Sequence, residues 1–427
     1  MRLEKVEVIV PGLESFVFPR MVTIDQHFCK DAVEDVSSEL TAQMAAAALP
    51  DIAGKSIAIT AGSRGIPHVV EAFATIVRSL RERGAAPFII PAMGSHGKGT
   101  AEGQAAVLEH QGITETSIGA PIRSATEVVP VATMADGTPL YCDKLAQQSD
   151  GIVVFNKIKP HTSFRGDWES GLVKMIVIGL GKRQGAEMVH GHSILNFSQI
   201  IPEAGRALLA ATPILCGIGV VENAYNDLAR IDVMTPDEIF PREKEILVYA
   251  KDILGRLLFP EIDVLIVDEI GKNFSGTGMD PNVSGRTTSG HPGFDTIAVK
   301  KIFVRAVSPA SQGNANGIGA ADFTTLRLVD AMDFTSTYTN TITSRVSDSA
   351  RLPMILNNDR EAMALAIRGS FPATSEKARV VRIANTKAIH SIQVSEAFLP
   401  EIEGRAEFTV HGDPSPIDFG ADGNLTD

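Results

Sequence analysis

The residues best suited to chemistry gather in one stretch, residues 160–192, which reads PHTSFRGDWESGLVKMIVIGLGKRQGAEMVHGH. It contains His161, Lys174, His190 and His192. Imidazoles exchange protons near neutral pH and bind soft or borderline metal ions. Lys174 has apolar neighbours on both sides and precedes an apolar, strand-like run at residues 175–180. A lysine in apolar surroundings loses proton affinity and becomes a nucleophile or a covalent anchor. The alternative is a lysine that reaches solvent from the start of a strand.

Further polar residues follow apolar, strand-like segments: Arg64, His96 and His161 in the first half, with Glu222, and Lys272 in the second half. The fork of an arginine suits a carboxylate or phosphate, and two histidines can work as an acid/base pair on one substrate. The alternatives are a surface arginine and loop histidines that bond to backbone. If the strands are parallel, their carboxyl ends share one edge, where ligands bind.

Elements that alternate between strand and helix must position these residues. In the first half we expect strands at 55–60, 88–93, 151–158 and 213–221, with helices at 67–84 and 100–112. The alternation of strands and helices begins again near residue 258, with strands at 263–270, 301–307 and 378–383 and helices at 320–332 and 358–369. The pattern predicts an α/β protein of two domains, 1–257 and 258–427. Each domain has a mainly parallel sheet flanked by helices, and the active-site cleft lies between them.

Composition excludes several classes of partner. The 427 residues carry a net charge of −12, which argues against nucleic acid and anionic membranes. Cys29, Cys142 and Cys216 are too dispersed for a disulfide framework or a cysteine zinc site. The N-terminus has acidic residues where a signal peptide is apolar, and no run reaches the roughly 20 apolar residues of a spanning helix. We therefore expect a cytoplasmic protein that acts on a small molecule.

Four pieces of sequence, in order, resemble the lactate racemases that depend on a nickel-pincer cofactor. They are AGSRGIP around Arg64, GSHG around His96, the Pro-His pair at His161 followed by Lys174, and His190 at the family's separation from Lys174. The likeness covers most of the first 255 or so residues. In the C-terminal half, only Lys272 has a counterpart.

The resemblance implies a cofactor, the nickel-pincer nucleotide, in which nickel is bound to pyridinium-3,5-bisthiocarboxylic acid mononucleotide. His190 would be the nickel ligand and Lys174 would bind the cofactor, covalently in some members. His96 and His161 would be the alternating acid/base groups in a hydride-transfer racemisation. Arg64 would hold the substrate carboxylate, and Lys272 would polarise or position the substrate.

Two departures from the family pattern point away from lactate alone. Ala61 stands where lactate-racemising members have an aspartate, and the segment between His161 and Lys174 is longer than theirs. Within that segment, Arg165 is expected to meet a second anionic group and Trp168 a larger apolar body. The alternative is a surface loop. We therefore predict an isomerase, a racemase or epimerase of a 2-hydroxy acid that is not simply lactate.

Two other functions are open on the sequence alone. One is a cofactor-free, two-domain protein that binds or senses a small anion, although binding does not require paired bases. The other is a zinc-dependent hydrolase that uses His190, His192 and a carboxylate such as Glu187. Their spacing lacks the HExxH pattern of zinc proteases.

Overall fold

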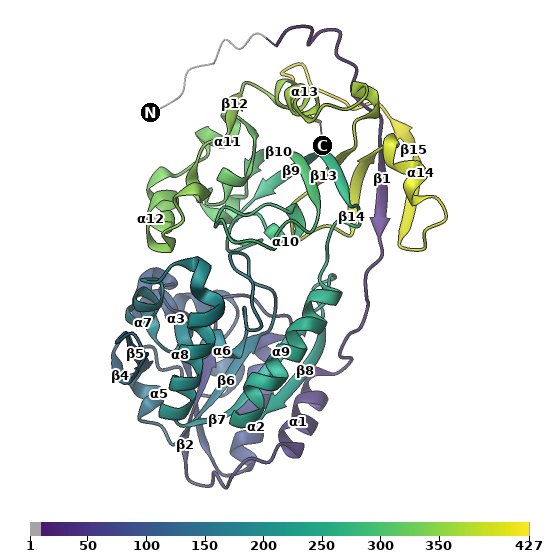
Figure 1. The fold of residues 1–427 in the computed structure, drawn as a ribbon. Helices are drawn as coiled ribbons and strands as arrows, with labels where there is room; N and C mark the ends of the chain where they lie inside the picture. The colour runs from purple at the N-terminus through teal and green to yellow at the C-terminus, as the bar shows by residue number, and fades with distance from the viewer. Residues whose placement is uncertain (1–9, 427) are drawn as a thin grey trace. The chain divides into compact units, whose positions relative to one another are not determined.

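The computed structural model describes residues 10–426, which form two compact units. One unit is Cys29–Leu254, and the other combines residues 10–28 with the chain from Gly255 onward (Figure 1). The predicted fold class, α/β with mainly parallel sheets flanked by helices, is confirmed. None of the helices within residues 10–426 has the length and apolar character needed to cross a membrane.

The unit Cys29–Leu254 is built on a five-stranded sheet of order β3-β2-β6-β7-β8. The first four strands in that order pair in parallel, and β8 pairs antiparallel with β7 at the edge. The strands are β2 Ser56–Ala61, β3 Ala86–Pro91, β6 Gly151–Lys157, β7 Ile214–Glu222 and β8 Leu228–Met234. A separate antiparallel hairpin joins β4 Val128–Thr133 to β5 Pro139–Asp143.

Helices cover both faces of this sheet, which explains why its strands read as nearly continuous apolar runs. Ile57 and Ile59 of β2 pack into a cluster with Leu40 and Phe73, whereas Ala58 belongs to the cluster on the opposite face. The helices of this unit are α1 Val36–Ala46, α2 Val69–Glu82, α3 Ala101–His110, α4 Glu115–Ile118, α5 Lys144–Gln147, α6 Leu172–Lys174, α7 Lys182–Val189, α8 Phe197–Ala211 and α9 Pro236–Ile253.

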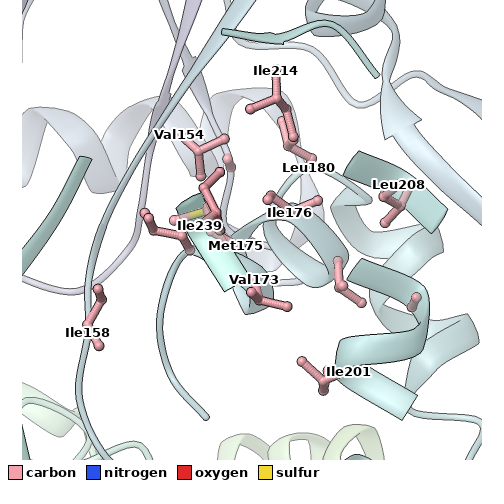
Figure 2. Packing of buried hydrophobic residues seen from close by; sticks show 14 of the residues in the cluster. Val154, Ile158, Val173, Met175, Ile176, Leu180, Ile201, Leu208, Ile214 and Ile239 are labelled. Atoms are coloured by element: carbon pink, nitrogen blue, oxygen red, sulfur yellow. The ribbon is translucent and has the colours of Figure 1, made fainter. Parts of the chain in front are cut away.

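The apolar run after Lys174, which we expected to be strand-like, is helical instead. Lys174 ends α6, and a π-helix, Met175–Gly179, follows directly. Val173, Met175 and Ile176 point into the core together with Ile201 of α8 and Ile239 of α9 (Figure 2). The error has a simple cause, since a short apolar run bears the same pattern in a buried strand and in a buried helix.

The other unit contains an eight-stranded sheet of order β12-β11-β10-β9-β13-β14-β1-β15. Its first five strands pair in parallel and its last three antiparallel. The strands are β12 Met354–Leu356, β11 Phe323–Thr325, β10 Ala298–Val307, β9 Glu261–Ile270, β13 Val380–Ile383, β14 Ser391–Ser395, β1 Met21–Gln26 and β15 Phe408–Ser415. The helices are α10 Pro281–Ser284, α11 Leu326–Asp330, α12 Phe334–Ser344, α13 Asp359–Ser370 and α14 Leu399–Ile402.

The position of β1 differs from the expected domain division, in which residues 1–257 formed one domain. β1 lies between β14 and β15, so residues 10–28 belong with the C-terminal part of the chain. The pairing joins Ile24 to Ile392 and to Val410. The sequence of a strand does not reveal which distant strands pair with it. The alternation of apolar and polar residues in β1 is compatible with many partner strands.

Candidate active site

The parallel strand order brings three of the expected residues to one edge of the sheet. Arg64 follows β2, His96 follows β3 and His161 follows β6. β2 pairs in parallel with both β3 and β6, so all three loops leave from the same edge, as we expected. Arg64 and His96 are exposed there, and His161 is half-buried. The backbone N–H of His96 donates to the Met93 carbonyl at 3.1 Å, which fixes a tight turn after β3.

The centre of the site is a direct contact between Lys174 and His161, whose Nζ and Nε2 atoms lie 2.7 Å apart. The backbone N–H of Ser163 donates to Nδ1 of His161 at 3.0 Å. A backbone N–H can only donate, so Nδ1 carries a lone pair and the proton of the neutral ring is on Nε2. That Nε2–H donates to Lys174, which can accept only as a neutral amine. The hydrogen bonds therefore assign an uncharged lysine.

Electrostatics favour the same protonation states. Burial, followed by the positive charges of Arg64 and Lys159, lowers the pKa of Lys174 to about 7. Burial, followed by the charge of Lys174, lowers the pKa of His161 well below its ordinary value. A lysine with a pKa near 7 is a neutral amine in a large fraction of molecules at physiological pH, and this form is the nucleophile.

A buried carboxylate holds the helix that carries Lys174. Glu243 of α9 is 1% exposed, and it accepts a hydrogen bond from the backbone N–H of Val173 at 2.9 Å. Burial raises the pKa of Glu243 to about 7, against the opposing effect of the Val173 and Leu172 N–H groups. Gly171 makes this approach possible, because a Cβ at that position would overlap the carboxylate. Backbone amides at the start of a helix are suited to an anion of this kind.

His190 directly follows α7 as its C-cap and lies near His161. Its ring is 5.3 Å from that of Phe197, which in turn stacks edge-on with Phe164 at 5.5 Å. Phe164 lies against the His161 ring at 4.4 Å. The charge of His190 also contributes to lowering the pKa of His161. A half-buried imidazole in this position is a suitable ligand for nickel.

The other residues considered for a zinc site face elsewhere. Nε2 of His192 lies 3.3 Å from Oγ1 of Thr138 and 3.7 Å from Asp136. Glu187 pairs with Arg183 at 2.7 Å. Among residues 10–426 there is no group of three or more histidine, cysteine, aspartate or glutamate side chains that could hold a metal ion. A zinc site composed only of protein ligands therefore finds no support in the described part of the chain.

Arg165 and Trp168 are both anchored to protein in the longer segment. Arg165 donates to the His161 carbonyl at 2.9 Å and lies 3.5 Å from the Glu169 carboxylate. The indole Nε1 of Trp168 donates to the Phe240 carbonyl at 2.9 Å, and its ring packs edge-on against that of Phe240. These contacts make the segment an ordered wall attached to α9, and the role of both residues in substrate binding stays a prediction.

Lys272 belongs to the other unit, in the loop after β9. Its backbone N–H donates to Oγ of Ser311 at 2.7 Å, and its Nζ donates to the Gly276 carbonyl at 2.5 Å. Its expected role in positioning the substrate stays a prediction.

Three residues that matter to the site were missed in the sequence: Lys159, Glu169 and Glu243. Lys159 lowers the pKa of both Lys174 and His161, and its position just after β6 was a usable signal. Glu169 and Glu243 are each 1% exposed, although their sequence surroundings resemble those of ordinary surface carboxylates. For Glu243 no local signal exists, because its partners lie 70 residues earlier in the chain.

The geometry can be compared with known proteins. The family model of the lactate racemase N-terminal domain matches residues 26–200. Residues 26–200 are thus similar to the N-terminal domain of lactate racemases. The matched range includes Arg64, His96, His161, Lys174 and His190 but not Lys272. The resemblance read from the four pieces of sequence is thereby confirmed at the level of the family.

Solved structures show how far the fold of this lactate racemase-like chain is shared. The lactate racemase apoprotein from Thermoanaerobacterium thermosaccharolyticum superposes with a TM-score of 0.54 at 12% identity, over 90% of this chain and 96% of that one. A protein from Thermotoga maritima gives a TM-score of 0.47 at 14% identity, over 65% of this chain and 72% of that one. No curated protein sequence matches this chain significantly. The first similarity shows that the fold of the racemase apoprotein is retained.

Proposed function

We propose that this protein is an isomerase that racemises or epimerises a 2-hydroxy acid other than lactate alone. The observation that carries the proposal is the Lys174–His161 contact, 2.7 Å long, within the segment that matches the lactate racemase N-terminal domain. A neutral amine bonded to an imidazole suits cofactor capture and proton transfer. A protein that only binds an anion has no need for such a pair.

The residues present fit the cofactor that the family implies. Lys174 is a neutral amine able to form a covalent bond, and His190 offers an imidazole to nickel. Arg64 and Lys159 place positive charge around Lys174, which favours the anionic groups of a nucleotide. Held by Lys174 and His190, the nickel-pincer nucleotide would supply reversible hydride-transfer chemistry at C2 of the substrate.

The chain's own groups handle the substrate and its proton. In the proposal, Arg64 binds the substrate carboxylate, Lys272 positions the substrate, and His96 and His161 exchange the hydroxyl proton. His161 has its proton on Nε2 and donates it to Lys174 in the structure. To accept a proton at Nε2, the ring must move its own proton to Nδ1 and lose the Ser163 N–H bond. We therefore expect the turn at Ser163 to change when the site is loaded.

The departure from lactate rests on the pocket's changed walls. Ala61, the last residue of β2, offers no carboxylate, and the ordered segment adds the guanidinium of Arg165 next to His161 and the indole of Trp168 against Phe240. A substrate with a second anionic group or a larger apolar body would meet these additions.

The test is conversion of enantiopure acids by loaded protein. The chain is produced in a host that makes the cofactor, and the added mass on Lys174 is measured first. The loaded protein is then incubated with a panel of enantiopure 2-hydroxy acids that includes lactate, dicarboxylic and aromatic members, followed by chiral chromatography. Lys174→Ala and His190→Ala variants serve as controls. Binding without any change of configuration, in protein shown to be loaded, would reject the isomerase in favour of an anion-binding protein.

A further inference from the structure

The segment that begins at His161 is closed by one buried carboxylate, that of Glu169. Oε2 of Glu169 accepts the backbone N–H of His161 at 2.7 Å, and Oε1 accepts that of Gly166 at 3.2 Å. Lys251 of α9 pairs with Oε1 at 2.6 Å, and Arg165 lies 3.5 Å from Oε2. The Glu169 side chain is fully buried. The carboxylate thus joins both ends of the turn of residues 161–166 and ties it to α9.

This closed turn determines where the proton of His161 resides. Ser163 lies inside the turn, and its N–H meets Nδ1 of His161 only while the chain folds back at residue 161. Arg165 reinforces the same fold by donating to the His161 carbonyl at 2.9 Å. With Nδ1 occupied, the ring presents Nε2–H to Lys174, and an ammonium group at that position finds no acceptor in the ring. The neutral amine is the form that this arrangement selects.

We propose that Glu169 is a positioning residue that fixes the tautomer of His161 and thereby keeps Lys174 uncharged and nucleophilic. Packing alone does not account for this selection. Phe164 holds the plane of the His161 ring from one face, at 4.4 Å, but contact with a ring face does not decide which nitrogen carries the proton. The inference concerns the site of the proposed function, although it requires no racemisation to be tested.

The Glu169→Gln substitution is a sharp perturbation because a carboxylamide has one acceptor oxygen. In the wild-type protein, both oxygens of the carboxylate are used by the N–H groups of His161 and Gly166 and by Lys251. If the glutamine oxygen stays toward Lys251 and the Gly166 N–H, the glutamine NH₂ group faces the His161 N–H. Two hydrogen-bond donors then oppose each other, and the turn opens. The Ser163 N–H then leaves Nδ1, the ring can carry its proton there, and Nε2 accepts from the Lys174 ammonium.

The readout is the reactivity of Lys174 as a function of pH in the full chain, produced in a host without the cofactor. Limited acetylation with trace acetic anhydride from pH 5 to 9, followed by peptide mass spectrometry, gives the midpoint at which Lys174 becomes nucleophilic. The charged and titratable groups around the Lys174–His161 pair are Lys159, Arg64, Arg165 and His190. Glu243 contacts α6 through the Val173 N–H, and all of these groups are retained in the variant. The matched control is Asp167→Asn, which removes an exposed carboxylate that pairs with Lys244 at 2.6 Å in the same segment.

We expect the midpoint of Lys174 to rise by about one pKa unit or more in Glu169→Gln, which is about tenfold less labelling at pH 6. Asp167→Asn should leave it unchanged. A folded Glu169→Gln protein with the wild-type midpoint would overturn the proposal. If that variant does not fold, Lys251→Met decides the matter, because it weakens the same carboxylate clasp: a rise in the midpoint supports the proposal and no rise overturns it. Failure to racemise any acid would leave this labelling result intact, so the two proposals fail separately.

Discussion

The buried carboxylate of Glu243 makes the stability of the unit Cys29–Leu254 depend on pH in a direction opposite to that of most carboxylates. Burial raises the pKa of Glu243 from 4.5 to about 7 in the folded protein. Between these values the folded state retains a proton that the unfolded chain releases, so the free energy of unfolding falls as the pH rises through this window. Glu243→Gln cannot titrate and should lose this slope.

The size of the effect follows from the same shift. At about 1.4 kcal/mol per pKa unit, the wild-type protein should lose about 2–3 kcal/mol from this group between pH 5 and pH 8, most of it below pH 7. The glutamine forgoes one hydrogen bond to the start of α6, at a cost of about 1 kcal/mol that does not change with pH. The variant is therefore expected to be slightly less stable than wild type at pH 5 and more stable at pH 8.

Trp168 provides the assay, because it is the only tryptophan in the chain and its indole bonds to Phe240 on α9 at 2.9 Å. Urea unfolding followed by tryptophan fluorescence at pH 5, 6, 7 and 8 reports on the element that carries Glu243. Glu245→Gln, an exposed carboxylate two positions along α9, is the control and should keep the wild-type slope. Equal pH dependence in Glu243→Gln and wild type would refute the reasoning.

Other perturbations test the same neighbourhood. Gly171→Ala places a methyl group on the Glu243 carboxylate and should cost about 1–3 kcal/mol in the same urea assay; an unaffected midpoint would contradict the close packing. Lys182→Met removes the ammonium group that lies 3.0 Å from the buried Asp143 carboxylate in the wild-type protein. This should lower the free energy of unfolding by about 3–5 kcal/mol, and adding Asp143→Asn should recover part of this loss. The rate at which apoprotein gains cofactor mass on Lys174, measured by intact mass, should rise about tenfold per pH unit up to a pH of about 7 and level off above it; a flat profile would count against a neutral-amine mechanism.

Much of the fold and part of the site could be predicted from the sequence. The alternation of apolar runs with helical segments was enough for parallel sheets, and it placed Arg64, His96 and His161 after strands that prove to be neighbours. Those inferences succeed because strand ends and turn residues are local signals. The order of the motifs and the separation of Lys174 from His190 indicated the resemblance to lactate racemases for the same reason, since both are properties of the chain itself.

Other features were decided only by tertiary structure. Ile24 pairs with strands that lie hundreds of residues away in the chain, and Glu243 reaches Val173 from a different helix. The apolar residues after Lys174 form a π-helix that is buried among α8 and α9. Their sequence did not predict this, because a short apolar run is compatible with a buried helix and with a buried strand.

The sequence by itself determined which reactive side chains leave the same sheet edge and which family the chain resembles. Only the tertiary structure determines the protonation states of Lys174 and His161. The charge on Lys174 depends on His161 at 2.7 Å, on burial and on the cations around it. The proton on His161 depends on a backbone N–H held in place by a turn. Proton affinity is set by distance and solvent exclusion in three dimensions, and neither quantity is encoded in the local order of residues.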